Sequence, residues 1–83
     1  MDVRLLVGLN FRKLRTMRGL TQEQAAEQTG MSQQYISGLE RGHRNPTVLT
    51  LHELGSPLGV EPLELLRPVE DGETDRAEWV KAT

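Results

Sequence analysis

The sequence predicts an all-α fold, and two observations carry this prediction. Within residues 3–18, Val7, Phe11 and Leu14 lie at positions i, i+4 and i+7, the spacing that places apolar side chains on one face of a helix. Glycines recur at the ends of short segments, and no segment shows the alternation of apolar and polar residues typical of a strand. The pattern predicts a compact bundle of five short helices.

Residues that cap helices mark the second and third segments. Thr21 begins the second helix, and Gln24 three residues later completes the pattern of a capping box. Gly30 ends this helix, Ser32 is a favourable N-cap for the third helix, and Gly42 ends that one. The chain is therefore expected to contain two short helices joined by a tight turn.

A fourth and a fifth helix follow, with a break between them. Thr47 caps the fourth helix, whose apolar candidates are Leu49, Leu51, Leu54 and Leu58. The segment Gly55-Ser56-Pro57 interrupts it, because a proline inside a helix removes a hydrogen bond and crowds the preceding turn, at a cost of ~3 kcal/mol. We expect the fourth helix to stop or kink near Ser56, and a short fifth helix over residues 62–66 to begin with Pro62.

Composition divides the chain into two parts. Residues 1–67 hold the helical pattern, whereas residues 68–83 form an acidic C-terminal tail in which residues 74–81 are a candidate for one or two helical turns. The 83 residues include no cysteine, which excludes disulfides and thiolate metal sites. No apolar run approaches the ~18 residues of a membrane span, and no signal peptide is recognisable, so we expect a cytoplasmic protein without a membrane partner.

Charge is distributed unevenly along the chain, whose formal net charge is −2. Residues 1–44 contain seven basic and four acidic side chains, a balance of +3, whereas residues 45–83 contain three basic and eight acidic ones, a balance of −5. This uneven distribution favours a basic face that binds a polyanion, with the acidic side chains elsewhere on the protein. Solvated charges on the surface of any small protein are the alternative explanation.

The third helix carries the side chains that suggest a function. Gln33, Gln34 and Ser37 would lie on the surface, away from Ile36 and Leu39 in the core. A glutamine amide both donates to and accepts from the edge of adenine in the major groove, and each such pair favours the correct base over a wrong one by ~1–3 kcal/mol. The segment therefore predicts a helix that reads DNA bases.

Phosphate contacts are expected on both sides of this helix. The N-terminus of the second helix, with Gln22, can hydrogen-bond a phosphate with help from the helix dipole. Arg41, Arg44 and the loop over residues 42–47 would hold the next phosphates along the backbone. Taken singly, each of these is an ordinary surface residue, and Tyr35 is expected to be half-packed between helices. The prediction therefore depends on their joint spacing.

A longer pattern runs through residues 8–66. Its members are Gly8, Phe11, Arg12, Leu14, Arg15, Gly19, Leu20, Thr21, Gln22, Ala26, Gly30, Ser32, Ile36, Ser37, Glu40, Arg41, Gly42, Asn45, Pro46, Leu51, Leu54, Leu58, Gly59, Val60 and Leu63. This pattern resembles the lambda-repressor/Cro-like helix-turn-helix family, also called the XRE family. The resemblance implies a five-helix bundle that binds operator DNA as a two-fold dimer.

Carried over by position, the resemblance assigns Gln22 to a phosphate, and Gln33 and Gln34 to base reading. The full expected DNA-binding set is Gln22, Ser32, Gln33, Gln34, Tyr35, Ser37, Arg41, Arg44 and Asn45. Arg15 and Glu40 are implied to form an internal ion pair between the first and third helices, so we assign them to structure. The expected dimer interface consists of Val60, Pro62, Leu63, Leu66 and Trp79.

The sequence departs from the family pattern at three places. Ala25 stands where leucine is usual, which reduces the volume that the second helix packs. Gly38 stands where many relatives carry a polar side chain, which removes a contact and weakens the helix by ~1 kcal/mol relative to alanine. The Gly55-Ser56-Pro57 break replaces a continuous helix and leaves the geometry of the fifth helix and of the dimer open.

Two functions remain open from sequence. The first is a homodimeric transcriptional regulator of prokaryotic type, a phage-type repressor or a controller of restriction-modification genes. Its two third helices would lie ~34 Å apart on a palindromic operator of double-stranded DNA. The alternative is a protein-interaction module, such as an antitoxin that binds a partner protein through the C-terminal region with Trp79 and Val80.

An enzyme is not expected. The chain has no cysteine nucleophile, no glycine-rich phosphate loop and no paired carboxylates in an obvious pocket. His43 and His52 are nine residues apart, one in a loop and one on a presumed helix, and we interpret them as surface residues rather than metal ligands. No cofactor is predicted.

Overall fold

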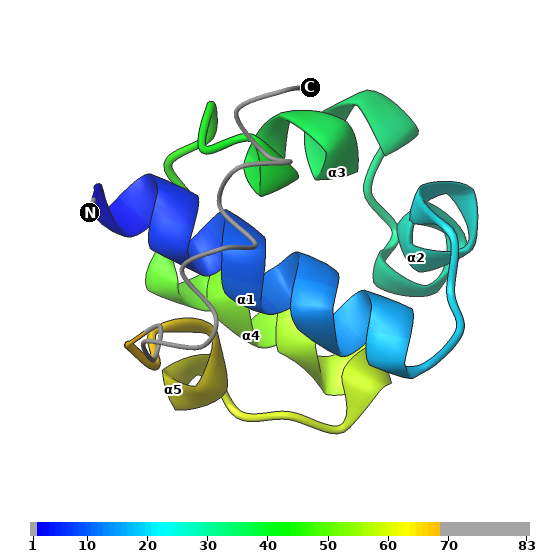
Figure 1. The fold of residues 1–83 in the computed structure, drawn as a ribbon. Coiled ribbons are helices and arrows are strands. Elements are labelled where there is room, and N and C mark those ends of the chain that lie inside the picture. The colour runs from blue at the N-terminus through cyan, green and yellow to red at the C-terminus, as the bar shows by residue number, and fades with distance from the viewer. Residues whose placement is uncertain (1, 69–83) are drawn as a thin grey trace.

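The computed structural model describes residues 2–68 of the chain, and all regular structure within that range is helical (Figure 1). The elements are α1 (Val3–Met17), α2 (Gln22–Thr29), α3 (Gln33–Glu40), α4 (Val48–Gly55), a 3₁₀ turn η1 (Ser56–Leu58) and α5 (Pro62–Leu65). The predicted all-α, five-helix bundle is confirmed. The tail beyond Pro68, including the helical turns expected over residues 74–81, lies outside the described residues.

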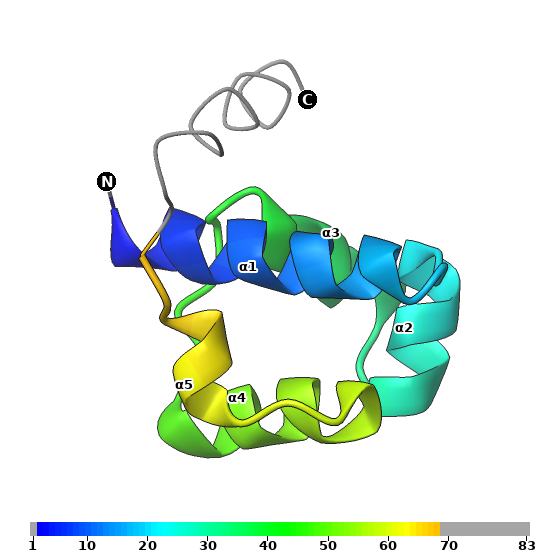
Figure 2. The same cartoon turned by 60° about the horizontal axis from the view of Figure 1, so that its bottom comes forward.

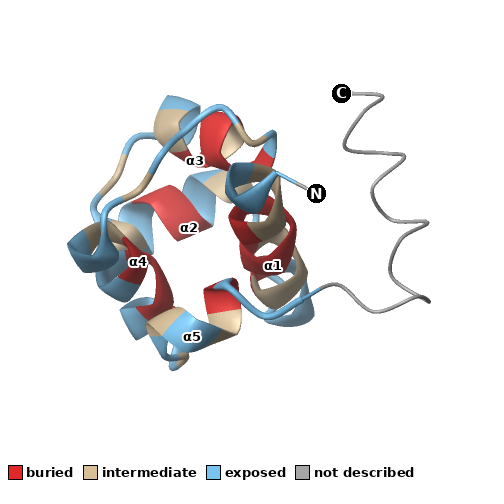
Figure 3. Cartoon of the chain, turned by 90° about the vertical axis from the view of Figure 1, so that its left-hand side faces the viewer, coloured by how far each residue is buried: buried red, intermediate tan, exposed pale blue. Residues whose placement is uncertain are grey.

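The core lies between the helices, whose buried faces turn toward a common centre (Figure 3). α1 packs against both α3 and α5, and α2 packs against α3. Figures 1 and 2 place α3 and α5 on opposite sides of the bundle. The apolar side chains with no exposed surface are Phe11, Ile36, Leu39, Leu54 and Leu65. Burying such a side chain contributes ~1.5–3 kcal/mol, so these residues hold α3 against the rest of the bundle.

The predicted N-caps are present. The Thr21 hydroxyl accepts from the N–H of Gln24 at 3.1 Å, and the Gln24 side-chain oxygen accepts from the N–H of Thr21 at 2.9 Å, which confirms the capping box. Ser32 begins α3 and Thr47 begins α4 with the same contact to the N–H three residues on. Each cap contributes ~1 kcal/mol and fixes the residue at which its helix begins.

The break after α4 also follows the prediction. α4 ends at Gly55, and the 3₁₀ turn η1 follows it, so the regular helix stops next to Ser56. The N–H of Val60 donates to the Gly55 carbonyl at 3.1 Å, and a Cβ on Gly55 would lie only 2.6 Å from the carbonyl oxygen of Val60. The absence of a side chain at Gly55 therefore permits the close return that leads into α5.

One apolar prediction on α4 is wrong. Leu51, Leu54 and Leu58 are buried, whereas Leu49 is 66% exposed. Because Leu49 and Leu51 are two positions apart on a helix with about 3.6 residues per turn, they point in nearly opposite directions. Only one of them can reach the core, so Leu49 is a surface residue.

A buried amide ties α5 to α1, and the sequence did not single it out. The Asn10 Nδ2 group donates to the carbonyl of Leu65 at 2.9 Å and to that of Arg67 at 2.8 Å. These carbonyls lie at the C-terminal end of α5, where a helix leaves its own acceptors without intrahelical partners. Asn10 thereby anchors a helix of only four residues and settles the position of α5 within the bundle.

Candidate nucleic-acid interface

The outer side of α3 carries the predicted base-reading side chains. Gln33 and Gln34 are exposed, and Ser37 is half-buried beside them. On the inner side of the same helix, Ile36 and Leu39 are fully buried. The inner pair fixes the orientation of α3, so the two amides lie in solvent at the N-terminal end of this helix.

The other predicted contact residues flank this surface. Ser32 is exposed, and its hydroxyl is used as the N-cap of α3, where it accepts from the N–H of Tyr35 at 3.0 Å. Arg41, Arg44 and Asn45 are exposed in the segment that follows α3. Of these cations, Arg44 lies beside the outer side of α3, close to Tyr35 and Gly38.

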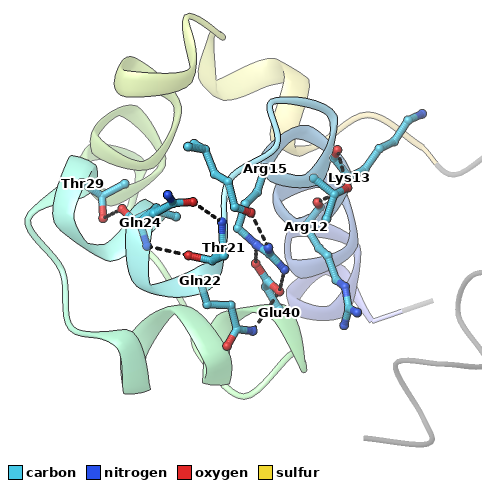
Figure 4. A network of polar contacts seen from close by, with 11 residues as sticks. Arg12, Lys13, Arg15, Thr21, Gln22, Gln24, Thr29 and Glu40 are labelled. Carbon is cyan, nitrogen blue, oxygen red and sulfur yellow. Dashed lines mark hydrogen bonds and ion pairs between the residues drawn. The ribbon is translucent and has the colours of Figure 1, made fainter.

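Gln22 is engaged inside the protein. Its Nε2 group donates to Glu40 Oε1 at 3.1 Å, and the side chain is half-buried at the start of α2 (Figure 4). The predicted phosphate contact through this amide therefore competes with Glu40. The N–H of Gln24 in the first turn of α2 is used by the capping box, whereas the other N–H groups of that turn do not compete with Glu40 and gain from the positive end of the helix dipole.

Glu40 also forms the expected ion pair with Arg15. Arg15 Nε donates to Glu40 Oε2 at 2.7 Å and Arg15 Nη2 donates to Oε1 at 3.0 Å, with side-chain exposures of 9% and 2% (Figure 4). Arg15 Nη1 donates further to the carbonyl of Leu20 at 2.7 Å. This network joins α1, the turn before α2 and the end of α3, so it fixes α3 against α1 from inside the protein.

Arg44 and Tyr35 form a contact that sequence reasoning missed. The guanidinium carbon of Arg44 lies 5.3 Å from the centroid of the Tyr35 ring, within the range of a cation–π interaction. Partial burial raises the pKa of the Tyr35 hydroxyl above its usual value, and the nearby positive charge of Arg44 opposes that rise. Tyr35 is half-buried, as predicted, and it supports a cation of the candidate interface.

The residues expected at a dimer interface lie around α5, on the other side of the bundle from α3. Leu63 and Leu66 are exposed, Pro62 is half-buried, and Val60 packs against the core. Trp79 lies outside the described residues. The described part of this set therefore offers two exposed leucines three positions apart, Leu63 in α5 and Leu66 directly after it.

Within residues 2–68, no helix is long and apolar enough to cross a membrane. The same residues contain no group of three or more His, Cys, Asp or Glu side chains able to hold a metal ion. His43 and His52 are both exposed.

Comparison with known proteins identifies relatives of this chain. The model of the helix-turn-helix family HTH_3 matches residues 11–65. The chain is 56% identical over 71 residues to the uncharacterized HTH-type transcriptional regulator y4dJ of Sinorhizobium fredii, covering 86% of this chain and 92% of that protein. It is 35% identical over 66 residues to the control protein C.BamHI of Bacillus amyloliquefaciens, covering 78% and 82% of the two chains.

Solved structures agree with these matches. The restriction-modification controller protein C.AhdI from Aeromonas hydrophila has a TM-score of 0.71 and 39% identity, covering 75% of this chain and 94% of its own. The hypothetical transcription factor NHTF from Neisseria has a TM-score of 0.77 and 29% identity, covering 94% and 85%. These relatives are regulators and controller proteins, which confirms that the chain is not an enzyme. The protein belongs to the HTH_3, or XRE-type, family of DNA-binding helix-turn-helix transcriptional regulators.

Proposed function

We propose that the protein binds a specific operator as a homodimer and reads the major groove with α3. The observation that supports this proposal most directly is the exposure of Gln33 and Gln34 on a helix whose inner face, with Ile36 and Leu39, is fully buried. An amide at the N-terminal end of a recognition helix can form a paired donor and acceptor contact with adenine. We therefore assign base reading to this end of α3.

Cations beside the reading surface would supply the affinity that does not depend on sequence. Arg41 and Arg44 follow α3 and are exposed, and Asn45 adds an exposed amide next to them. Contacts of this kind fix the position of a protein on the phosphate backbone, whereas contacts to base edges specify the sequence. Each neutralised phosphate releases counterions, so binding is expected to weaken steeply as salt rises.

Dimerisation through α5 fits this mode of binding. Leu63 in α5 and Leu66 directly after it are exposed, and an isologous contact between two copies would cover both pairs of leucines. Because α5 lies on the other side of the bundle from α3, pairing there leaves both reading helices free (Figures 1 and 2). Two α3 helices related by a two-fold axis would enter successive major grooves ~34 Å apart and select a palindromic operator.

The alternative of a protein-interaction module depended on the tail over residues 68–83. Nearly all of that tail lies outside the described residues, so no observation of the structure supports a partner site there. We therefore do not propose it. A cytoplasmic location accompanies the proposal, since this is where a prokaryotic regulator meets its DNA.

A selection of bound sequences from a random pool of double-stranded DNA tests the proposal. We expect an enriched palindrome, and in Gln33→Ala a preference at one base pair in each half-site that is relaxed by ~1–3 kcal/mol, roughly 5- to 150-fold for each half-site. Affinity for random DNA should not change. Gln28→Ala removes an exposed amide from α2, outside the predicted set, and serves as the matched control.

Charge variants separate base reading from phosphate contact. Arg44→Ala should weaken binding to all sequences alike and reduce the slope of log K against log salt by about 1 for each protomer, and so by about 2 for the dimer. Arg67→Ala makes the same change in net charge beyond α5 and should leave the slope unchanged. Equal losses of Gln33→Ala on selected and random DNA would contradict the reading role. A pool without any enriched sequence would contradict the proposed function itself.

A further inference from the structure

The backbone after α3 turns back over that helix. Gly42 has φ of 78°, and its N–H donates to the carbonyl of Leu39 at 3.0 Å, while the N–H of His43 donates to the carbonyl of Gly38 at 2.8 Å. This pair of hydrogen bonds is a Schellman arrangement, in which a glycine in the left-handed region ends the helix and redirects the chain. Arg44 follows immediately, so its side chain begins beside the last turn of α3.

The side chain of Arg44 lies lengthwise across Gly38. A Cβ built on Gly38 would lie 3.0 Å from Nε, 3.6 Å from Cγ and 3.7 Å from Cδ of Arg44. The three nearest atoms to this position thus all belong to one side chain, and Gly38 is buried although it lies on the outer half of α3. Arg44 covers the space that a side chain at position 38 would need.

The far end of the same side chain stacks on Tyr35, with 5.3 Å between the guanidinium carbon and the ring centroid. Tyr35 and Gly38 are three residues apart on α3 and therefore neighbours on its surface, and Gln34 lies four residues before Gly38 on the same side. The guanidinium is thus held at the edge of the surface that presents Gln34.

We propose that Gly38 is a positioning residue, whose missing side chain lets Arg44 lie against Tyr35 and meet DNA in a preset orientation. The proposal rests on the proposed DNA binding and goes beyond it, because Gly38 offers DNA no side chain of its own. From the sequence, Gly38 was expected to remove a contact, and the structure assigns it the space for a different one. A cation ordered before binding loses less conformational freedom when DNA arrives.

Substitution at Gly38 should separate DNA binding from stability. A Cβ at 3.0 Å from a flexible side chain forces a shift of a few tenths of an ångström, and a longer side chain such as glutamine fills the path of Arg44. The substitution should also stabilise α3 itself, since glycine is among the poorest helix formers. A glycine kept only for folding would give the opposite result, a loss of stability on substitution.

The test uses the full chain with Gly38→Gln and the milder Gly38→Ala. We expect an unfolding midpoint that is unchanged or higher, and loss of the ring-current shift that Tyr35 imposes on the side-chain protons of Arg44 in the free protein. Affinity for the DNA selected from the random pool should fall by about 2- to 10-fold for Gly38→Gln, the range expected when one side chain must be ordered on binding. Gly38→Ala should change the same three quantities less.

A double-mutant cycle with Arg44→Ala excludes the simpler explanation that a glutamine at position 38 obstructs DNA. If Gly38 acts through Arg44, Gly38→Gln has no further effect on affinity once Arg44 is alanine. Additive losses would overturn the inference, as would an Arg44 resonance that does not move in Gly38→Gln.

Failure of the inference and failure of the proposed function give different results. If the unmodified chain enriches a DNA sequence and Gly38→Gln binds that sequence equally well, only the role of Gly38 is overturned. If the unmodified chain enriches no sequence, the proposed function is overturned and the inference falls with it.

Discussion

Replacing Glu40 with alanine should destabilise the folded protein by about 3–5 kcal/mol, because it leaves a buried guanidinium without its carboxylate. The Arg15 and Glu40 side chains are only 9% and 2% exposed. The substitution removes the acceptors of two hydrogen bonds from Arg15 and of one from Gln22. Water cannot replace these partners unless the contact between α1 and α3 opens.

This loss is large relative to the stability of so small a bundle. A domain is stable by roughly 0.05–0.15 kcal/mol per residue, which gives about 3–10 kcal/mol for residues 2–68. Each kcal/mol moves the melting temperature of a domain of about 60–100 residues by about 4–8 °C, so Glu40→Ala should lower it by about 12–40 °C. The variant should therefore lose DNA binding through unfolding rather than through altered specificity.

Glu64 provides the matched control. It accepts two hydrogen bonds from Arg67 at 3.0 and 2.8 Å, in the same two-pronged geometry, but the side chains of this pair are 64% and 38% exposed. Glu64→Ala should destabilise the protein much less than Glu40→Ala, because water solvates the Arg67 guanidinium that remains. Replacing Arg15 and Glu40 together with methionine should restore most of the stability lost in Glu40→Ala, since no charge then remains buried.

Urea and thermal unfolding followed by far-UV circular dichroism would measure these differences. Protein concentration must be held constant, because self-association raises the apparent stability of the folded form. If Glu40→Ala and Glu64→Ala cost the same, burial does not set the value of the ion pair. If the double methionine variant is as unstable as Glu40→Ala, the loss does not arise from an unpaired charge.

Two further predictions concern α5. Leu63→Glu should abolish self-association in sedimentation experiments without changing the helical circular dichroism signal, because this side chain is 70% exposed. Leu49 on α4 is comparably exposed, so Leu49→Glu is the control and should leave association intact. The reverse result would move the dimer surface to α4. Asn10→Leu should lower the free energy of unfolding by about 1–3 kcal/mol, because it leaves the carbonyls of Leu65 and Arg67 without a donor. It should also speed amide hydrogen exchange in α5 more than in α3. Uniform acceleration across the helices would argue that Asn10 does not hold α5 in particular.

Local chemistry accounts for what could be predicted about the fold. The N-caps at Thr21, Ser32 and Thr47 and the stop near Ser56 depend on residues within a few positions of each other, so short-range rules locate them. Leu49 was misplaced because an apolar run does not say which of its members faces inward. That choice depends on how α4 is rotated against the other helices.

The candidate site was predictable only in part. Periodicity predicted that Gln33 and Gln34 would be exposed, because Ile36 and Leu39 fix the buried side of α3. The engagement of Gln22 by Glu40 was not predictable from spacing, since it joins residues 18 positions apart. This contact decides which donors at the start of α2 are free for a phosphate.

The sequence by itself determined the helices, their caps and the membership of α3 in a helix-turn-helix, because each follows from neighbours along the chain. Tertiary structure alone decided that Asn10 holds the end of α5, 55 residues away, and that Arg44 lies over Gly38 against Tyr35. The first contact forms only after packing has brought distant segments together and excluded the water that would otherwise solvate their polar groups. Arg44 is only six residues from Gly38 along the chain, but this spacing does not say that its side chain crosses the glycine, because that path depends on the space around the folded helix.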